Sequence, residues 1–151
     1  MHTFADTLGR TWTVTINVDV IRRVRSLLNI NLLEAVEGRL LERLITDPVL
    51  LCDILFVVIQ PEAVAKEISD EDFGRSLGGD VLDLATTALL EELVDFFPSA
   101  KRTVFRKALI KLKQLETLAI ETATQRLESS ELEQRMRAAI SGTQAASTSG
   151  N

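Results

Sequence analysis

The spacing of apolar residues changes its period near the start of the chain. Apolar and polar residues first alternate, which places their side chains on opposite faces of a β-strand. The apolar members are Trp12, Val14, Ile16 and Val18. The preceding stretch HTFAD predicts a partner strand, with a turn in DTLGR where Gly9 can adopt a positive φ. Phe4 should then lie opposite Trp12 across the hairpin.

A two-stranded hairpin is marginal alone, so its apolar face should pack on helices. The open edge of such a hairpin also offers a second interpretation, in which it accepts a strand from another subunit or a partner.

Further along, apolar residues recur three and four positions apart, which predicts a succession of helices. The first should run from Val20 to about Leu28 and the second from Leu32 to about Ile45. Short polar or glycine-containing connections separate these helices from those that follow. The predicted N-caps are Asp19, Thr46 or Asp47, Ser69, Asp80 and Ser99.

The third helix, from Pro48 to about Gln60, is apolar nearly all round, as expected of a central helix. We expect Cys52 to be buried in it, and Asp53 to have a partner or an edge position. Pro61 should interrupt or restart this helix.

The segment from Asp80 to Phe97 is amphipathic and ends before Pro98, with Glu92 among the residues on its wetter sides. The final helical pattern runs with breaks to about Ile140. Its apolar residues form a narrow seam of coiled-coil type at Phe105, Ala108, Leu112, Leu115 and Ala119. The seam fails at Thr122 and Arg126, so the distal part should be exposed or covered by a partner.

These patterns predict one mainly α domain over residues 1–140, with an N-terminal β-hairpin (1–18) packed on a bundle of about five to six helices and a long C-terminal helix. Residues 141–151 should form a flexible polar tail. For contacts with a partner we predict six residues, on the hairpin and on the seam: Trp12, Val14, Ile16, Phe105, Leu112 and Leu115.

Composition narrows the class of protein. A single cysteine excludes an internal disulfide framework, and the N-terminus lacks the basic and apolar regions of a signal peptide. The longest apolar run, Val49 to Ile59, is shorter than the ~20 residues that span a bilayer. The expectation is a soluble protein inside the cell.

Charge is unevenly distributed along the chain. Residues 31–95 carry four basic and fifteen acidic side chains, whereas residues 96–151 carry nine basic and five acidic ones. The basic run from Lys101 to Lys113 suggests electrostatic complementarity within the chain or between subunits. Nucleic-acid binding by this run is the alternative, although the pI near 5.0 and the single aromatic in the run argue against it.

The sequence contains few of the residues and motifs that are typical of catalytic sites. His2 is the sole histidine, at a terminus expected to fray, there is no tyrosine, and nucleotide-binding and hydrolase motifs are absent. The acidic segment SDEDFG fits a capped helix start better than a calcium loop. The expectation is a non-catalytic interaction protein without metal or cofactor.

The order of features resembles tail assembly chaperone-like proteins of tailed bacteriophages. The resemblance covers residues 4 to 115 in pattern, on a GRTWTVTINV strand, a DPVLLCDILFVVI core helix, an ISDEDFGRSL connector and a helix ending in DFFP. It implies a protein that binds the long tape measure protein in the host cytoplasm, self-associates along it, and is absent from the finished particle. Two alternatives are a structural or adaptor subunit of a virion or contractile machine, and a helical regulatory module that binds nucleic acid.

Overall fold

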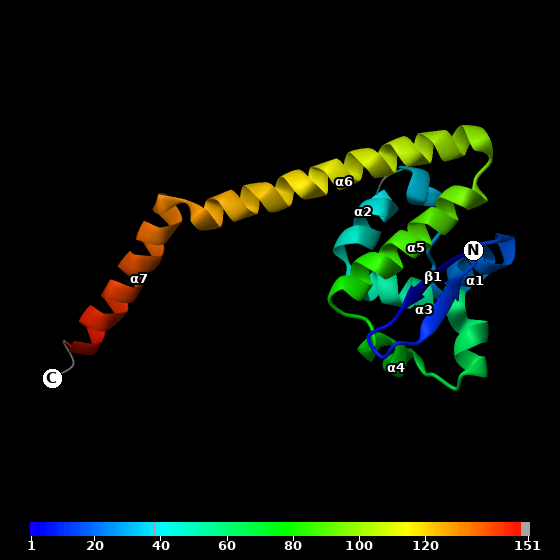
Figure 1. Cartoon of the computed structure of the whole chain (residues 1–151), viewed down its shortest axis with the longest axis horizontal. Helices are drawn as coiled ribbons and strands as arrows, with labels where there is room; N and C mark the ends of the chain where they lie inside the picture. The colour runs from blue at the N-terminus through cyan, green and yellow to red at the C-terminus, as the bar shows by residue number, and fades with distance from the viewer. Residues whose placement is uncertain (38, 149–151) are drawn as a thin grey trace. The chain divides into compact units, whose positions relative to one another are not determined.

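A computed structural model describes the backbone of residues 1–37 and 39–148. The chain is mainly helical and opens with an antiparallel hairpin, as predicted (Figure 1). In chain order the elements are β1 (His2–Ala5), β2 (Thr11–Val14), α1 (Val18–Leu28), the 3-10 helix η1 (Leu32–Glu37), α2 (Arg39–Thr46), α3 (Pro48–Ala65), α4 (Asp70–Arg75), α5 (Asp80–Phe96), α6 (Ser99–Glu128) and α7 (Ser130–Thr148).

The chain divides into two compact units, residues 1–109 and residues 110–151, which we call the N-terminal and C-terminal units. Every buried apolar side chain of the described residues belongs to the N-terminal unit. The boundary falls inside α6, and the predicted tail begins inside α7. Residues 149–151 of that tail lie outside the described residues, and the extent of the domain stays a prediction.

The hairpin has the predicted register, with Phe4 opposite Trp12 and Gly9 in the turn at φ +80°. The strand was predicted too long, because β2 ends at Val14 and Val18 already belongs to α1, where it is exposed. The N-cap of α1 is Asn17, whose side chain accepts from the Val20 amide at 2.9 Å, so the prediction of Asp19 was wrong. Leu27, near the end of α1, is also exposed.

The second predicted helix is two elements, η1 and α2. The Asn31 side chain accepts from the Leu33 amide at the start of η1, and Gly38, between the two elements, lies outside the described residues. Leu40, Leu41 and Leu44 are buried. Leu33 is 39% exposed because a 3-10 turn and an α-turn place residues at different angles.

Helix α3 is the central helix of the N-terminal unit. It packs against β2, α1, α2, α4 and α5, and its cap is Asp47, one of the two residues predicted for this position. It continues through Pro61 to Ala65, so the predicted interruption was wrong. Pro61 lacks a backbone donor, and the loss is offset by the burial of Ala63 and by the hydrogen bond from the Lys66 amide to the Glu62 carbonyl. Asp53 has the predicted exposed position.

Among the described helices, α3 is the one long and apolar enough to cross a membrane, judged by length and composition. In this structure 44% of its residues are buried, and five neighbouring elements cover it, which is the environment of a core helix. Cys52 on this helix was predicted buried but is half-buried.

Helices α4 and α5 follow their predicted order with two changes. Ser69 caps α4 as predicted, by accepting from the Asp72 amide at 3.2 Å. Gly79, at φ +56°, precedes α5, and Asp80 is its first residue rather than its cap. Glu92, predicted to lie on a wetter side of the helix, is 6% exposed because β1 lies along this face of α5.

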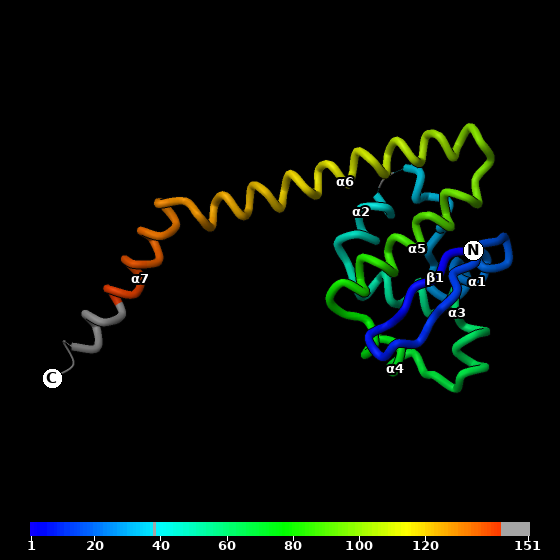
Figure 2. The backbone as a smooth tube through the Cα atoms, in the orientation of Figure 1, coloured from blue at the N-terminus to red at the C-terminus, as the bar shows by residue number. Residues whose placement is uncertain are grey.

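Aromatic side chains hold the N-terminal unit together in two clusters. Phe73 of α4 contacts Phe4, Trp12 and Phe56, with ring centroids 5.4–6.5 Å apart. The second cluster joins Phe97 to Phe96 and Phe105. It lies where the chain reverses between α5 and α6 (Figure 2). Ser99, predicted to cap α6, is instead its first residue.

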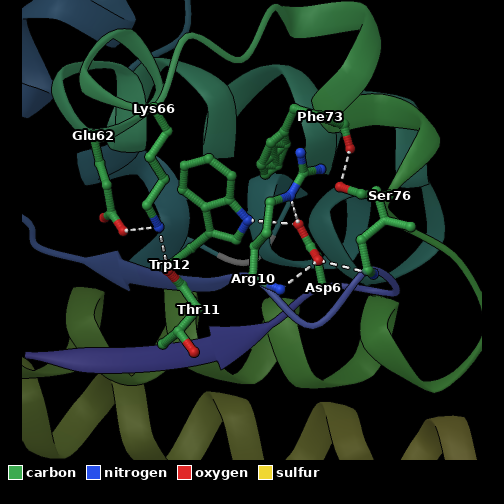
Figure 3. Close-up of polar contacts among 9 residues, drawn as sticks. Asp6, Arg10, Thr11, Trp12, Glu62, Lys66, Phe73 and Ser76 are labelled. Atoms are coloured by element: carbon green, nitrogen blue, oxygen red, sulfur yellow. Dashed lines mark hydrogen bonds and ion pairs between the residues drawn. The ribbon is translucent and has the colours of Figure 1, made fainter.

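Asp6 organises the hairpin turn. Its buried carboxylate accepts from Trp12 Nε1 at 2.9 Å, from Arg10 Nε at 2.8 Å and from the amides of Leu8 and Arg10 (Figure 3). Burial raises the pKa of Asp6, but these four hydrogen bonds outweigh it and lower the pKa to about 2. The carboxylate is therefore charged and satisfied inside the fold.

We expect Asp6 to make the stability of the fold depend on pH in acid. Because its folded pKa of about 2 lies below the ordinary 3.8, the stabilisation is present above pH 3.8 and is lost as the pH falls through about 2. At about 1.4 kcal/mol per pKa unit, the free energy of unfolding should fall by about 2 kcal/mol. Urea unfolding between pH 2 and 5 measures this. Asp6→Asn should flatten the dependence, and Asp19→Asn, at an exposed carboxylate, should preserve it.

Candidate partner-binding surfaces

The six residues predicted to bind a partner occupy different environments. Trp12, Val14 and Phe105 are completely buried and Ile16 is 8% exposed, so in this structure these four belong to the core. Leu112 is half-buried, and Leu115 is 54% exposed. Of the predicted set, Leu112 and Leu115 are therefore the two that reach the surface, and the partner-binding role of all six stays a prediction.

The outer edge of β2 is occupied by side chains of α3 (Figure 3). The Thr13 amide donates to Glu62 Oε2 at 3.1 Å, and Lys66 Nζ donates to the Thr11 carbonyl at 2.8 Å. Lys66 also lies 4.5 Å from the centre of the Trp12 ring, a cation–π distance. Two backbone groups that an added strand would need along β2 are thus already bonded. The alternative that an edge of the hairpin accepts a strand stays a prediction.

An apolar groove of about 370 Å³ lies between η1 and the first turns of α6, inside the N-terminal unit. Phe97 is buried in its wall, while Val104 is 56% exposed. Glu37 and Lys101 add one charge of each sign. The described lining residues are Leu33, Val36, Glu37, Phe97, Ala100, Lys101 and Val104.

A second apolar surface lies on α6 within the C-terminal unit. It is a shallow depression along one side of the helix, where the leucines are more than half exposed and the small Ala119 and Ala123 lie between them. Its lining residues are Leu115, Leu118, Ala119, Thr122, Ala123, Arg126 and Leu127. The predicted failure of the seam at Thr122 and Arg126 is visible as two polar residues within this otherwise apolar face.

A charged cluster joins β1 to α5. His2 Nδ1 lies 2.8 Å from Glu92 Oε1, His2 Nε2 lies 3.0 Å from Glu91 Oε2, and the terminal ammonium of Met1 lies 2.7 Å from Glu92. Burial raises the pKa of Glu92, but hydrogen bonds from the terminal ammonium and His2 outweigh it, so the pKa is lowered. The expectation that His2 frays was wrong, because these contacts fix it in β1.

This cluster also contains a set of possible metal ligands. One ligand atom each from His2, Glu92 and Asp95 lie within 4.8 Å of one another, and imidazole and carboxylate are donors that suit zinc. Glu92 already bonds to His2 and to the terminal ammonium, which gives His2 and Glu92 a structural role. Sequence reasoning missed this cluster because 90 positions separate the two residues in the chain.

Cys52 is a poor nucleophile in this environment. Burial raises the pKa of its thiol, and the nearby carboxylates of Asp53 and Asp70 raise it further. The thiol therefore stays protonated at neutral pH, whereas a reactive cysteine needs its thiolate form.

The fold and these surfaces define a mainly helical chain with one apolar groove in its N-terminal unit and one apolar helix face in its C-terminal unit. Comparison of the chain with protein-family models, with curated proteins and with solved structures gave no match.

We expect the seam to divide sharply between core and surface residues. Phe105→Ala removes a completely buried ring that contacts Phe97 and should lower the free energy of unfolding by about 3–5 kcal/mol. Leu115→Ala, at a 54% exposed position on the same helix, should change it by less than about 0.5 kcal/mol. Urea unfolding of the two variants measures the difference. Equal losses would show that Leu115 is part of the core in solution.

Proposed function

We propose that this chain is a non-catalytic tail assembly chaperone, which binds a tape measure protein or a similar long helical client in the host cytoplasm during assembly of a phage tail. The observation that carries the proposal is the exposed apolar face of α6 in the C-terminal unit. Leu115, Leu118 and Leu127 are 54%, 57% and 71% exposed there.

The arrangement of this face suits a helical partner. Leu115, Leu118 and Ala119 recur at the three- and four-residue spacing at which one helix presents a stripe to another. The small side chains of Ala119 and Ala123 allow the axis of a partner helix to come close, with leucines on either side. Recognition of an amphipathic helix by an apolar surface is a common mode of peptide binding.

Exposure of this face also favours a function in which a partner covers it. Isolated exposed apolar residues are ordinary, but a contiguous apolar patch on a soluble domain usually marks an interaction site. Each leucine fully removed from water would contribute roughly 1.5–3 kcal/mol, so a few of them supply a useful share of a binding energy.

The chemistry of the N-terminal unit supports a non-catalytic role. Its two carboxylates with lowered pKa values, Asp6 and Glu92, both bond to neighbouring structural groups. The groove lined by Phe97 and Val104 is apolar with only two charged side chains, which fits a protein segment better than a reacting substrate. We include this groove as a second contact for a client or for another copy of the chain.

Affinity purification of the tagged protein from its native host, followed by mass spectrometry, tests the proposal. We expect enrichment of one very long helical protein, and absence of the chaperone from finished particles. Recovery of the chain in finished particles would favour the structural-subunit alternative. Recovery with nucleic acid alone would favour the regulatory one.

A pair of variants separates binding from folding once the client has been purified. Leu115→Gln with Leu127→Gln replaces two exposed leucines of the apolar face and should weaken client binding at least about tenfold, equivalent to 1.4 kcal/mol. Gln114→Ala with Gln125→Ala alters exposed positions of the same helix outside that face and serves as the control. Titration calorimetry measures binding, and circular dichroism confirms that both variants keep their helix content. Equal binding by the two variants would contradict the proposal.

A further inference from the structure

A polar pocket of about 460 Å³ lies where α1, η1 and α2 meet in the N-terminal unit. Arg25 comes from the last turn of α1, Arg39 from the start of α2, and Arg43 from its last turn. The described lining residues are Arg25, Asn29, Ile30, Asn31, Glu34, Arg39, Leu40 and Arg43. Three exposed arginines and one exposed glutamate thus line the same pocket.

The positive charge of this pocket is not neutralised within the described residues. Arg10, Arg23 and Arg75 of the same unit each form an ion pair with a carboxylate. Arg25, Arg39 and Arg43 form no ion pair with any described residue, and Glu34 lies farther than ion-pair distance from all three. In an acidic chain of net charge −5, such a concentration of unpaired arginines is a distinct local feature.

Stabilisation of the helix ends does not explain the positions of all three arginines. Arg25 and Arg43 lie in last turns, where a positive charge interacts favourably with the helix dipole. Arg39 is the first residue of α2, where the dipole disfavours a positive charge and favours an anion. An anion in the pocket would relieve this repulsion and the mutual repulsion of the three arginines.

Neutral hydrogen-bond donors also line the pocket. The turn from α1 to η1 depends on Asn29, which adopts the left-handed conformation at φ 55° and brings the 29–31 connection to the pocket. The Oδ1 atom of Asn31 accepts from the Leu33 amide, so its side-chain NH₂ group remains a donor available to a ligand. Ile30 and Leu40 add an apolar part to the lining.

We propose that this pocket binds a small ligand through a phosphate or diphosphate group. Guanidinium groups bind phosphate oxygens in pairs of parallel hydrogen bonds, and three of them can surround a doubly charged group. A pocket of 460 Å³ lies in the range of small-molecule sites and holds more than a bare phosphate ion. The site is separate from the apolar surfaces of the proposed chaperone function and does not depend on it.

A nucleic-acid backbone is a weaker fit than a small ligand. The three arginines converge on one pocket, whereas backbone binding needs positive charges spaced along an extended surface. The neighbouring acidic segment over residues 46–95 would also repel a long polyanion.

Titration calorimetry of the full chain with inorganic pyrophosphate, with ADP and with a single-stranded oligonucleotide tests the proposal. We expect pyrophosphate and ADP to bind at one site with a Kd below about 1 mM. Arg39→Gln should weaken this binding at least about tenfold. Arg22→Gln, which removes the same charge from an exposed position on α1 outside the pocket, should change it by less than about twofold. Thermal melts of both variants establish that they fold.

The outcomes are distinct. Equal affinity for pyrophosphate and ADP would support recognition of the phosphates alone, and tighter ADP binding would support an added contact with the apolar lining. Absence of binding by both ligands would overturn the proposal, as would equal losses in Arg39→Gln and Arg22→Gln. If the oligonucleotide bound more tightly than both ligands, and its log Kd changed with log salt concentration with a slope of several units, the pocket would be a nucleic-acid site instead.

Discussion

The hydrogen bond from Trp12 to the buried carboxylate of Asp6 is the interaction on which the N-terminal unit most depends. A buried charge is tolerated only when it is fully bonded, and Asp6 accepts from four donors within its own turn. The bond fixes the indole ring against Phe73, which connects the hairpin to α4. Two contacts then connect the same strand to α3 and its C-terminal end. Lys66 makes a cation–π contact with the indole ring, and Glu62 accepts a hydrogen bond from the backbone of β2. The Asp6 carboxylate thus orients a ring on β2 that contacts both α4 and the end of α3.

This constraint determines where a partner can bind. The apolar face of the hairpin is buried in the core, and Glu62 and Lys66 bond to the backbone along the edge of β2. These groups of the hairpin already have partners within the fold. Exposed apolar residues are scattered over the N-terminal unit, but they gather into a depression in the groove beside Phe97 and on α6 beyond residue 109. These positions are therefore where association with another chain would cost least in lost internal contacts.

Local signals in the sequence were enough for the elements, their order and several of their boundaries. Alternation and Gly9 predicted the hairpin and its register, and Asp47 and Ser69 were found as caps because capping depends on residues only two or three positions away. The prediction of Asp19 missed Asn17, because both residue types are good caps and only the backbone angles distinguish them. Glu92 was misplaced because the covering strand lies 90 positions earlier, and no helical pattern contains that information. The same limit applies to Trp12, Val14 and Phe105, since alternation and seam spacing identify an apolar face but not what covers it.

The groups most informative about function are those that folding leaves unsatisfied. Asp6 and Glu92 have strong electrostatic environments, yet each carboxylate is bonded to groups that hold the hairpin in place, so their lowered pKa values reflect stability. Arg25, Arg39 and Arg43 present the opposite case, because they bring like charges together around a pocket without an internal partner. The leucines on α6 are the apolar equivalent, exposed at positions where the fold gains nothing from them. Contacts within the chain explain neither the grouping of these three arginines around one pocket nor the exposure of these leucines, and both arrangements become favourable once a ligand or a partner supplies the missing contacts.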